Sequence, residues 1–256
     1  MSIRYMIHGC PKRAWYIDEF MLPELKRQGI SDDEVMVWMD TEGLGNLKSF
    51  VKSMEWVAEN CDPEEGIWHI QDDVLPSDTF AERTRAFDAE SNAVCYGFCN
   101  NIFDGGAVNY IGWQKSRFSW HSFQCIRIPN AYAAEFGPWF NDSFTQKFWA
   151  KHIEQNKNDD EIFKEFLHRN HYGEKLLNMM PCLVDHIDYM LGGTTINYGR
   201  QEKGDPRRPA YWWDEKEKTA ALAAKIAERE KRGSGDAERA KSRASGRSKR
   251  KAQDKP

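Results

Sequence analysis

The sequence predicts an α/β protein built on a mixed, mostly parallel sheet with helices on its faces. Strand-like apolar segments and amphipathic helix-like segments alternate between positions 4 and 70, as they do in βαβ units. Each of these strand-like segments runs directly into a turn or acidic residues. Of the 256 residues, 40% are hydrophobic and 30% are charged, which is typical of globular proteins and excludes a wholly disordered or collagen-like chain.

The N-terminal part of the chain, up to position 70, holds the clearest elements. Its patterns predict strands over 4–8, 34–39 and 66–70, and helices over 15–28 and 47–59. Gly29 fits the C-cap position of the first helix. The second helix is amphipathic, and its apolar residues share the face expected to point into the core: Leu47, Phe50, Val51, Met54 and Val57.

Strand-like and helix-like patterns alternate less regularly beyond position 70. Helices are expected over 78–88, 131–136, 145–155 and 160–168, and strands over 93–100 and 123–128. A last short apolar segment covers 183–187. Residues 103–118 are Gly-rich and are expected to be irregular.

The charge of the chain is unevenly distributed. Residues 229–256 carry eleven Lys or Arg and four Asp or Glu, whereas residues 1–228 carry a net charge of −11. The sequence therefore divides into a globular domain over 1–213, a charged Ala-rich helix over 214–232 and a basic tail over 233–256. The tail is expected to be disordered because it has almost nothing apolar to bury. A basic tail attracts nucleic acid or simply improves solubility, and the sequence leaves both open.

The cysteines and the hydropathy bear on location. Six cysteines are scattered without a CxxC pair, which favours reduced thiols in a cytoplasmic protein, although Cys95 and Cys99 leave a zinc site as an alternative. No apolar run approaches the roughly 18 residues of a membrane span, and the N-terminus does not have the pattern of a signal peptide.

The strongest chemical signal is the pair Asp72-Asp73 directly after the apolar strand 66–70. Ligands of open α/β sheets bind at the carboxyl ends of the strands. Two adjacent carboxylates repel each other, so a nearby cation stabilises them. Mg²⁺ or Mn²⁺, held by one or two carboxylates together with substrate phosphates, is the usual cation in such a position. The alternative is a solvated turn or a helix N-cap.

These pieces together resemble the nucleotide-sugar glycosyltransferases of the GT-A fold, over residues 4–213. The resemblance is carried by the strand and turn of residues 5–13, by the strand ending in Asp40, and above all by His69-Ile70-Gln71-Asp72-Asp73-Val74-Leu75-Pro76. That last segment is similar to the family's acidic metal motif. Pro181-Cys182-Leu183-Val184-Asp185-His186 is similar to the C-terminal segment whose His completes the metal site.

The resemblance implies a metal ion that bridges the two phosphates of a UDP-sugar or similar donor. It implies Asp73 and His186 as ligands of Mn²⁺ or Mg²⁺, with Asp72 at the metal's waters or the ribose and Asp185 as a substitute for His186. The motif lacks the spacer of the common Asp-x-Asp form. Which of the two carboxylates touches the metal therefore stays open.

Further donor contacts are expected at the ends of the first two strands and near the end of the domain. His8 and Gly9 would face the base and ribose, Arg13 the pyrophosphate, and Asp40 the base or ribose. Arg207 and Arg208 follow a Gly-rich stretch, and one of them would place a cation on the phosphates if that segment closes over the donor. Ordinary turn and surface roles are the alternative for each.

A general base is expected at the start of the helix over 160–168. A transfer that inverts the sugar needs a carboxylate that accepts the proton of the acceptor hydroxyl. Asp159 and Asp160 occupy the position that the resemblance implies, and Asp160 is slightly favoured over Asp159. Either residue is equally well explained as a helix cap.

The acceptor follows from the resemblance and the tail. The chain looks like the compact, stand-alone glycosyltransferases of bacterial viruses, some of which act on hydroxymethylated pyrimidines in DNA. 5-Hydroxymethylcytosine in double-stranded DNA is therefore the expected acceptor, bound by the basic tail and an aromatic cleft near Trp113, Trp120 and His121, in the host cytoplasm and not at a membrane. The alternatives are a surface glycan, lipopolysaccharide or protein acceptor, a metal-dependent nucleotidyl or phosphoryl transferase, and a non-catalytic nucleic-acid-binding module.

Overall fold

The computed structural model describes residues 3–98, 112–115, 123–155, 159–174, 176–180, 182–187, 190–191 and 217–232. The chain divides into two compact units, Met1–Asp214 and Glu215–Pro256. In the second unit, residues 217–232 form a helix. The tail predicted over 233–256 lies outside the described residues.

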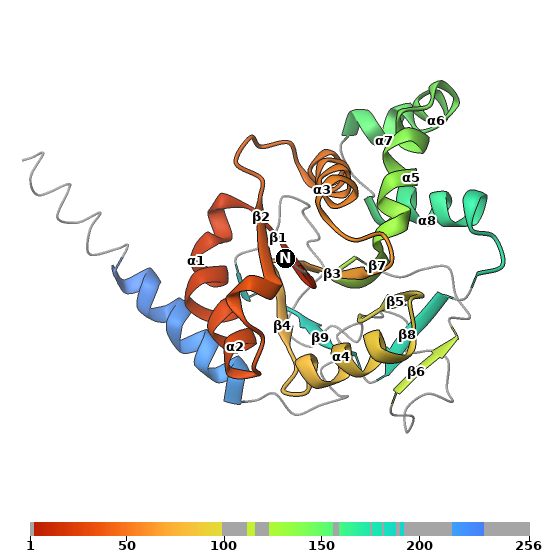
Figure 1. The fold of residues 1–256 in the computed structure, drawn as a ribbon. Coiled ribbons are helices and arrows are strands. Elements are labelled where there is room, and N and C mark those ends of the chain that lie inside the picture. Colours follow the sequence, from red (N-terminus) through yellow and green to blue (C-terminus); the bar gives the residue numbers. More distant parts are fainter. Residues whose placement is uncertain are drawn as a thin grey trace, which may run out of the picture. The chain divides into compact units, whose positions relative to one another are not determined.

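The first unit contains a seven-stranded sheet and a two-stranded sheet in the part of the chain that is described (Figure 1). The larger sheet has the order β2-β1-β3-β7-β5-β8-β6, and the smaller one pairs β4 with β9. The strands are β1 (Tyr5–Gly9), β2 (Val35–Met39), β3 (Gly66–Gln71), β4 (Val74–Pro76), β5 (Val94–Tyr96), β6 (Gly112–Lys115), β7 (Cys125–Pro129), β8 (Leu176–Met180) and β9 (Val184–His186).

The large sheet is mixed, and most of its described strands point the same way. β1 pairs in parallel with both β2 and β3, so Tyr5 lies opposite Val35 on one side and Trp68 on the other. β5 and β8 are also parallel. β7 runs antiparallel between β3 and β5, and β6 runs antiparallel to β8. The α/β class and the parallel pairing of the strands up to position 70 are thus confirmed.

Helices cover both faces of this sheet. The helices of the described part of this unit are α1 (Ala14–Tyr16), α2 (Leu22–Arg27), α3 (Asn46–Asn60), α4 (Phe80–Glu90), α5 (Asn130–Asn141), α6 (Ser143–Phe148), α7 (Ala150–Gln155) and α8 (Asp159–Asn170), of which α6 and α7 extend beyond α5 and not over the sheet (Figure 1). A π-helical turn, Ile17–Met21, joins α1 to α2, so the helix predicted over 15–28 is continuous. Short 3₁₀ turns precede α1 at Pro11–Arg13 and β2 at Asp32–Glu34.

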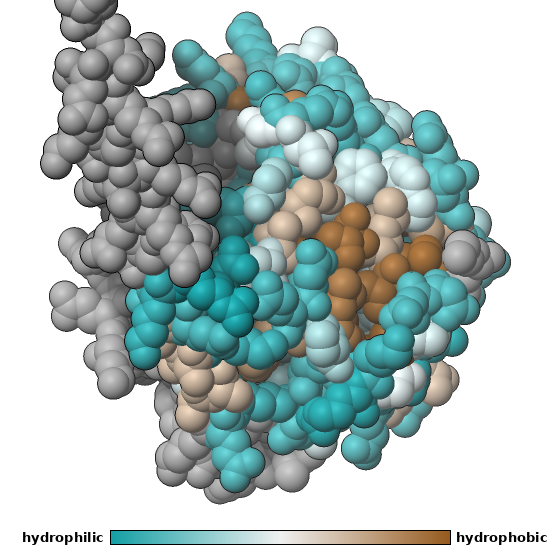
Figure 2. Space-filling model, turned by 90° about the vertical axis from the view of Figure 1, so that its left-hand side faces the viewer, coloured by the Kyte–Doolittle hydropathy of each residue, from teal (hydrophilic) through white to brown (hydrophobic). Residues whose placement is uncertain are grey.

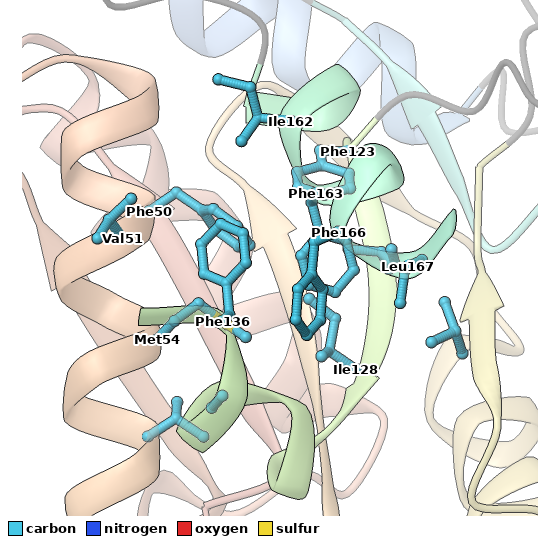
Figure 3. Close-up of a cluster of buried hydrophobic side chains, with 14 of the residues drawn as sticks. Phe50, Val51, Met54, Phe123, Ile128, Phe136, Ile162, Phe163, Phe166 and Leu167 are labelled. Carbon is cyan, nitrogen blue, oxygen red and sulfur yellow. The ribbon is translucent and has the colours of Figure 1, made fainter. Parts of the chain in front are cut away.

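The main hydrophobic core lies between the sheet and helices α3, α5 and α8 (Figure 3). The apolar residues predicted to face inward from α3 are all buried. Phe50 of α3 packs against Phe136 of α5 and Phe163 of α8, with ring centroids 5.5 and 5.7 Å apart. Aromatic rings bury large apolar areas, so this cluster fixes the start of α3 and the start of α8 beside the strand ends.

The opposite face of the sheet packs against α4 and the helical run of α1 and α2. The hydroxyl of Tyr5 on β1 lies 2.8 Å from Thr84 Oγ1 on α4, and the indole of Trp68 donates to Asp88 Oδ2 at 3.3 Å. Arg127 of β7 is buried beside the same carboxylate. The Tyr16 hydroxyl donates to the carbonyl oxygen of Val74, which ties α1 to the chain just beyond β3.

Several elements differ from the sequence predictions. The strand predicted over 93–100 covers only Val94–Tyr96 among its described residues, and β6 lies inside the segment 103–118 expected to be irregular. The helix predicted to end at 136 runs on to Asn141 through Pro138, because Trp139 and Phe140 pack against the core rings. The helix predicted over 145–155 is interrupted at Trp149 between α6 and α7.

On the molecular face drawn in Figure 2, hydrophobic residues gather in one patch within a largely hydrophilic surface. At the edge of the sheet, the residues of β2 are only partly buried, and Val37 is 36% exposed. None of the described helices has the length and apolar character needed to cross a bilayer. The cysteines in the described ranges are free thiols, and Cys99 lies outside those ranges.

Candidate functional site

A pocket of about 130 Å³ opens at the carboxyl ends of β1, β2 and β3, beside the start of α3. Parallel strands end at the same edge of a sheet, which is why segments far apart in the sequence meet there. Many of the residues predicted for the site line this pocket: His8, Gly9, Arg13, Asp40, Asp72, Asp73 and Asp159.

Asp72 and Asp73 are buried at the end of β3, with exposed fractions of 5% and 4%. Arg13 approaches both of them: its Nη1 lies 3.0 Å from Asp72 Oδ1 and 3.1 Å from Asp73 Oδ2. The second oxygen of Asp72 accepts the backbone N–H of Cys10 at 2.7 Å. The cation predicted beside the two carboxylates is therefore, in this structure, an arginine of the chain itself, whereas the sequence predicts that Arg13 faces the donor's pyrophosphate.

His186 reaches Asp73 through the small sheet. β4 follows Asp73 directly, and its antiparallel pairing with β9 sets Val74 opposite His186 and Leu75 opposite Asp185. The Nε2 atom of His186 lies 3.3 Å from Asp73 Oδ2. The structure thus brings His186 to the acidic pair, and Asp185 occupies the neighbouring position on β9.

The two carboxyl groups differ in their electrostatic surroundings. Burial raises the pKa of Asp72, and Arg13 opposes that shift. Burial also disfavours the charge on Asp73, but His186 and Arg13 outweigh it and hold the pKa of this carboxyl below its ordinary value. Asp73 is therefore the carboxylate that the site keeps ionised.

The donor atoms at Asp73 fit a hard divalent ion that takes part of its coordination from water and phosphate. Within the described residues, no group of three or more His, Cys, Asp or Glu side chains is placed so that it could hold a metal ion by itself. Mg²⁺ sites of substrate-binding enzymes need only one or two carboxylates. Asp73 Oδ1 is buried and has no hydrogen-bond partner among the described residues, so it is an available oxygen ligand.

A histidine pair forms the wall of the pocket between β1 and β3. His8 Nε2 and His69 Nδ1 lie 2.9 Å apart, and both rings pack against Phe50. Burial lowers the pKa of His8 to about 4. Burial and the neighbouring His8 lower the pKa of His69. Both imidazoles are therefore neutral at physiological pH, and they offer a ligand hydrogen-bonding atoms without charge.

Asp40 and Gly9 line the pocket, but each has a clear structural role. Asp40 accepts the backbone N–H groups of Leu44 and Gly45, both at 2.8 Å, and so shapes the loop that leads into α3. A Cβ on Gly9 would lie 2.5 Å from Ile17 Cδ1. Close packing against Ile17 explains this glycine without the close approach of a nucleotide that was expected there.

Asp159, and not the slightly favoured Asp160, lines the pocket from the first turn of α8. Burial, followed by the nearby charge of Asp160, raises the pKa of Asp159 to about 7. A carboxyl group with that pKa changes its charge near neutral pH, which is the property of an effective general base. Asp160 instead accepts the N–H of Glu161 at 2.9 Å.

Several site predictions fall elsewhere. Arg207, Arg208, Trp120 and His121 lie outside the described residues, as does the side chain of Trp113. Sequence reasoning missed His69, Phe50 and Gln71 as pocket residues. A detectable signal was present for His69, because a histidine interrupts an otherwise apolar strand shortly before Asp72.

Comparison of the chain with protein-family models and with curated protein sequences finds no match. The class of protein must therefore be inferred from the fold and from the geometry of the pocket.

Proposed function

We propose that this protein is a metal-dependent glycosyltransferase of the GT-A type, which moves a sugar from a nucleoside diphosphate donor, with UDP-sugar the first choice, to a hydroxyl acceptor. One observation carries the proposal. Two buried carboxylates end β3 inside a pocket, and His186, from a strand far along the chain, contacts the carboxylate with the lower pKa. Keeping acidic groups buried together costs free energy, so a fold that does so at its ligand-binding edge supports a role in cation and phosphate chemistry.

Asp73 and His186 would hold the divalent ion, which would neutralise the charge of the departing nucleoside diphosphate. Asp72 would orient the first turn of the chain after β1, through the N–H of Cys10. The neutral His8–His69 pair and Phe50 offer an uncharged wall that suits the nucleoside part of the donor.

Asp159 would accept the proton of the acceptor hydroxyl. In a single displacement the acceptor oxygen forms a bond to the anomeric carbon, the bond from that carbon to the phosphate oxygen breaks, and the nucleoside diphosphate leaves with the bonding electrons. The acceptor proton passes to the Asp159 carboxylate. A pKa of about 7 leaves this group ionised above neutral pH while keeping it basic enough to take the proton.

A donor screen tests the proposal directly. The purified chain is incubated with a panel of nucleotide sugars and Mn²⁺, and release of nucleoside diphosphate is measured with and without EDTA. We expect release from one donor class that EDTA abolishes. Release of pyrophosphate or phosphate would indicate the alternative nucleotidyl or phosphoryl transferase. Failure of UDP and Mn²⁺ to raise the melting temperature would favour a non-catalytic binding module, because a ligand that binds the folded state stabilises it.

For the acceptor we propose 5-hydroxymethylcytosine in double-stranded DNA, in the cytoplasm, which for a viral protein is that of the host. Support comes from the basic composition of residues 233–256 and from the virus-type resemblance. Basic side chains raise DNA affinity by releasing counterions. A flipped-out base would then reach the pocket.

Removing residues 233–256 is expected to weaken binding to hydroxymethylated duplex by at least about tenfold in low salt, while UDP binding stays unchanged. Fluorescence anisotropy measures the first and calorimetry the second. Mass spectrometry of digested DNA detects the added hexose, and unmodified duplex is the control. If no nucleoside gains a hexose but a glycan, lipopolysaccharide or protein does, the acceptor is one of those.

A further inference from the structure

Arg13 occupies the place beside Asp72 and Asp73 where a bound cation is expected. Its Nη1 atom lies close to both Asp72 Oδ1 and Asp73 Oδ2, where the positive charge of a bound divalent ion is expected. The Arg13 side chain is itself only 11% exposed. A metal ion at Asp73 and the guanidinium at its present place would put two cations against the same carboxylates.

Arg13 Nη1 forms ion pairs with the two carboxylates without hydrogen bonds of good geometry. This atom makes no hydrogen bond of acceptable geometry with either carboxylate, in spite of the short distances. Arg127 shows the contrast, because its guanidinium donates to Asp88, Asn92 and the carbonyl of Ala93 from three different nitrogens. A guanidinium held by several directed bonds is locked in place, whereas one that mainly neutralises charge is more readily exchanged for another cation.

The charge arithmetic favours such an exchange. Two carboxylates and one guanidinium leave one negative charge that His186, 3.3 Å from Asp73 Oδ2, has to meet, whereas a divalent ion by itself matches the charge of both carboxylates. A diphosphate that arrives with the metal brings further negative charge, which a released guanidinium would meet. Arg13 lies in the turn Pro11–Arg13 directly after β1 and lines the same pocket, so a change of side-chain conformation is sufficient.

We propose that Arg13 is an exchangeable cation: it occupies the Asp72–Asp73 pair in the metal-free protein and moves to the donor's diphosphate when a divalent ion takes its place. This inference rests on the proposed function, and it deepens it by coupling the two ligands. Metal alone must displace Arg13 and binds weakly. A diphosphate gives the displaced side chain a new partner, so each ligand strengthens the binding of the other by the same factor.

Arg13→Met tests the exchange, with Mn²⁺ and UDP as the probes. Free Mn²⁺ is measured by electron paramagnetic resonance during titration of the full chain, first without UDP and then with it. We expect Arg13→Met to bind Mn²⁺ alone at least about tenfold more tightly than the unaltered protein. At saturating Mn²⁺ it should bind UDP at least about tenfold more weakly. The opposite signs are the signature, because a merely structural role would weaken both.

Two further variants serve as a control and as a substitute for Arg13→Met. Arg85→Met is the matched control, since Arg85 is a partly exposed arginine paired with Glu34 away from the pocket, and it should change neither affinity. Arg13→Gln removes the charge but keeps an amide that donates to the carboxylates, and it should show the same opposite signs if Arg13→Met does not fold.

The outcomes separate the two hypotheses. If the unaltered protein binds Mn²⁺ and UDP but neither Arg13 variant binds Mn²⁺ more tightly, the exchange is wrong and the proposed function stands. If neither the unaltered protein nor any variant binds Mn²⁺, with or without UDP, the proposed metal-dependent function is wrong, and the exchange with it.

Discussion

Asp73→Asn is expected to lower metal-dependent transfer by at least about 10³-fold and to abolish the gain in UDP affinity that Mn²⁺ provides. Asp73 is the carboxylate with a buried oxygen that has no hydrogen-bond partner among the described residues, and it is the one that His186 contacts. An amide is isosteric with the carboxylate but carries no charge, so the variant removes the metal's main attraction while keeping the packing.

Steady-state release of nucleoside diphosphate and calorimetric titration of UDP with Mn²⁺ measure the two effects. Asp72→Asn is the informative comparison, because both oxygens of Asp72 already have partners in Arg13 and the Cys10 N–H. We expect a smaller loss for it, of about 10- to 100-fold. Asp78→Asn alters an exposed carboxylate paired with Arg27 and should leave turnover unchanged. Full activity in Asp73→Asn would refute the metal assignment.

The part of the fold up to position 70 could be predicted because its structure follows from local patterns. β1, α3 and β3 each show the pattern of their type, and the helical segments between successive strands are the crossover connections that parallel pairing requires. β8 was missed because Leu176–Met180 lacks alternation and has Asn178 at its centre. Its strand conformation depends on pairing with β5 and β6, which are distant in sequence.

The candidate site divides in the same way. The order of the motifs along the chain predicted that Asp72, Asp73 and His186 lie close together. The antiparallel pairing of β4 with β9 explains how His186 reaches the two carboxylates. The partner of Arg13 was not predictable, because it depends on which buried charges face an arginine once the turn after β1 has folded. Whether Asp159 or Asp160 points into the pocket depends on the residue at which α8 begins. The sequence pattern does not locate the start of a helix to a single residue.

Asp159→Asn is expected to lower transfer by about 10²- to 10⁴-fold while leaving the affinity for UDP and Mn²⁺ unchanged, because the base acts on the acceptor and not on the donor. Asp160→Asn is the matched control, one residue further along the same helix turn, and it should lose less than about threefold. Comparable loss in both variants with loss of UDP binding would show a structural role for the start of α8.

The pKa of about 7 for Asp159 adds two pH signatures. Transfer by the unaltered protein should rise about tenfold per pH unit below pH 7 and level off above it, since the ionised carboxylate is the base, and Asp159→Asn should lack this pH dependence.

The stability of the fold should also depend on the protonation of Asp159. The folded state keeps the proton between about pH 4 and 7, where the unfolded chain has lost it, so this group makes the fold less stable as pH rises across that window. The stability of Asp159→Asn relative to the unaltered protein should therefore increase from pH 4 to pH 8, by up to about 4 kcal/mol. Thermal melts at pH 4 and pH 8 measure this difference. If Asp159→Asn instead loses stability relative to the unaltered protein as pH rises, the carboxyl group of Asp159 does not destabilise the fold, and the raised pKa is wrong.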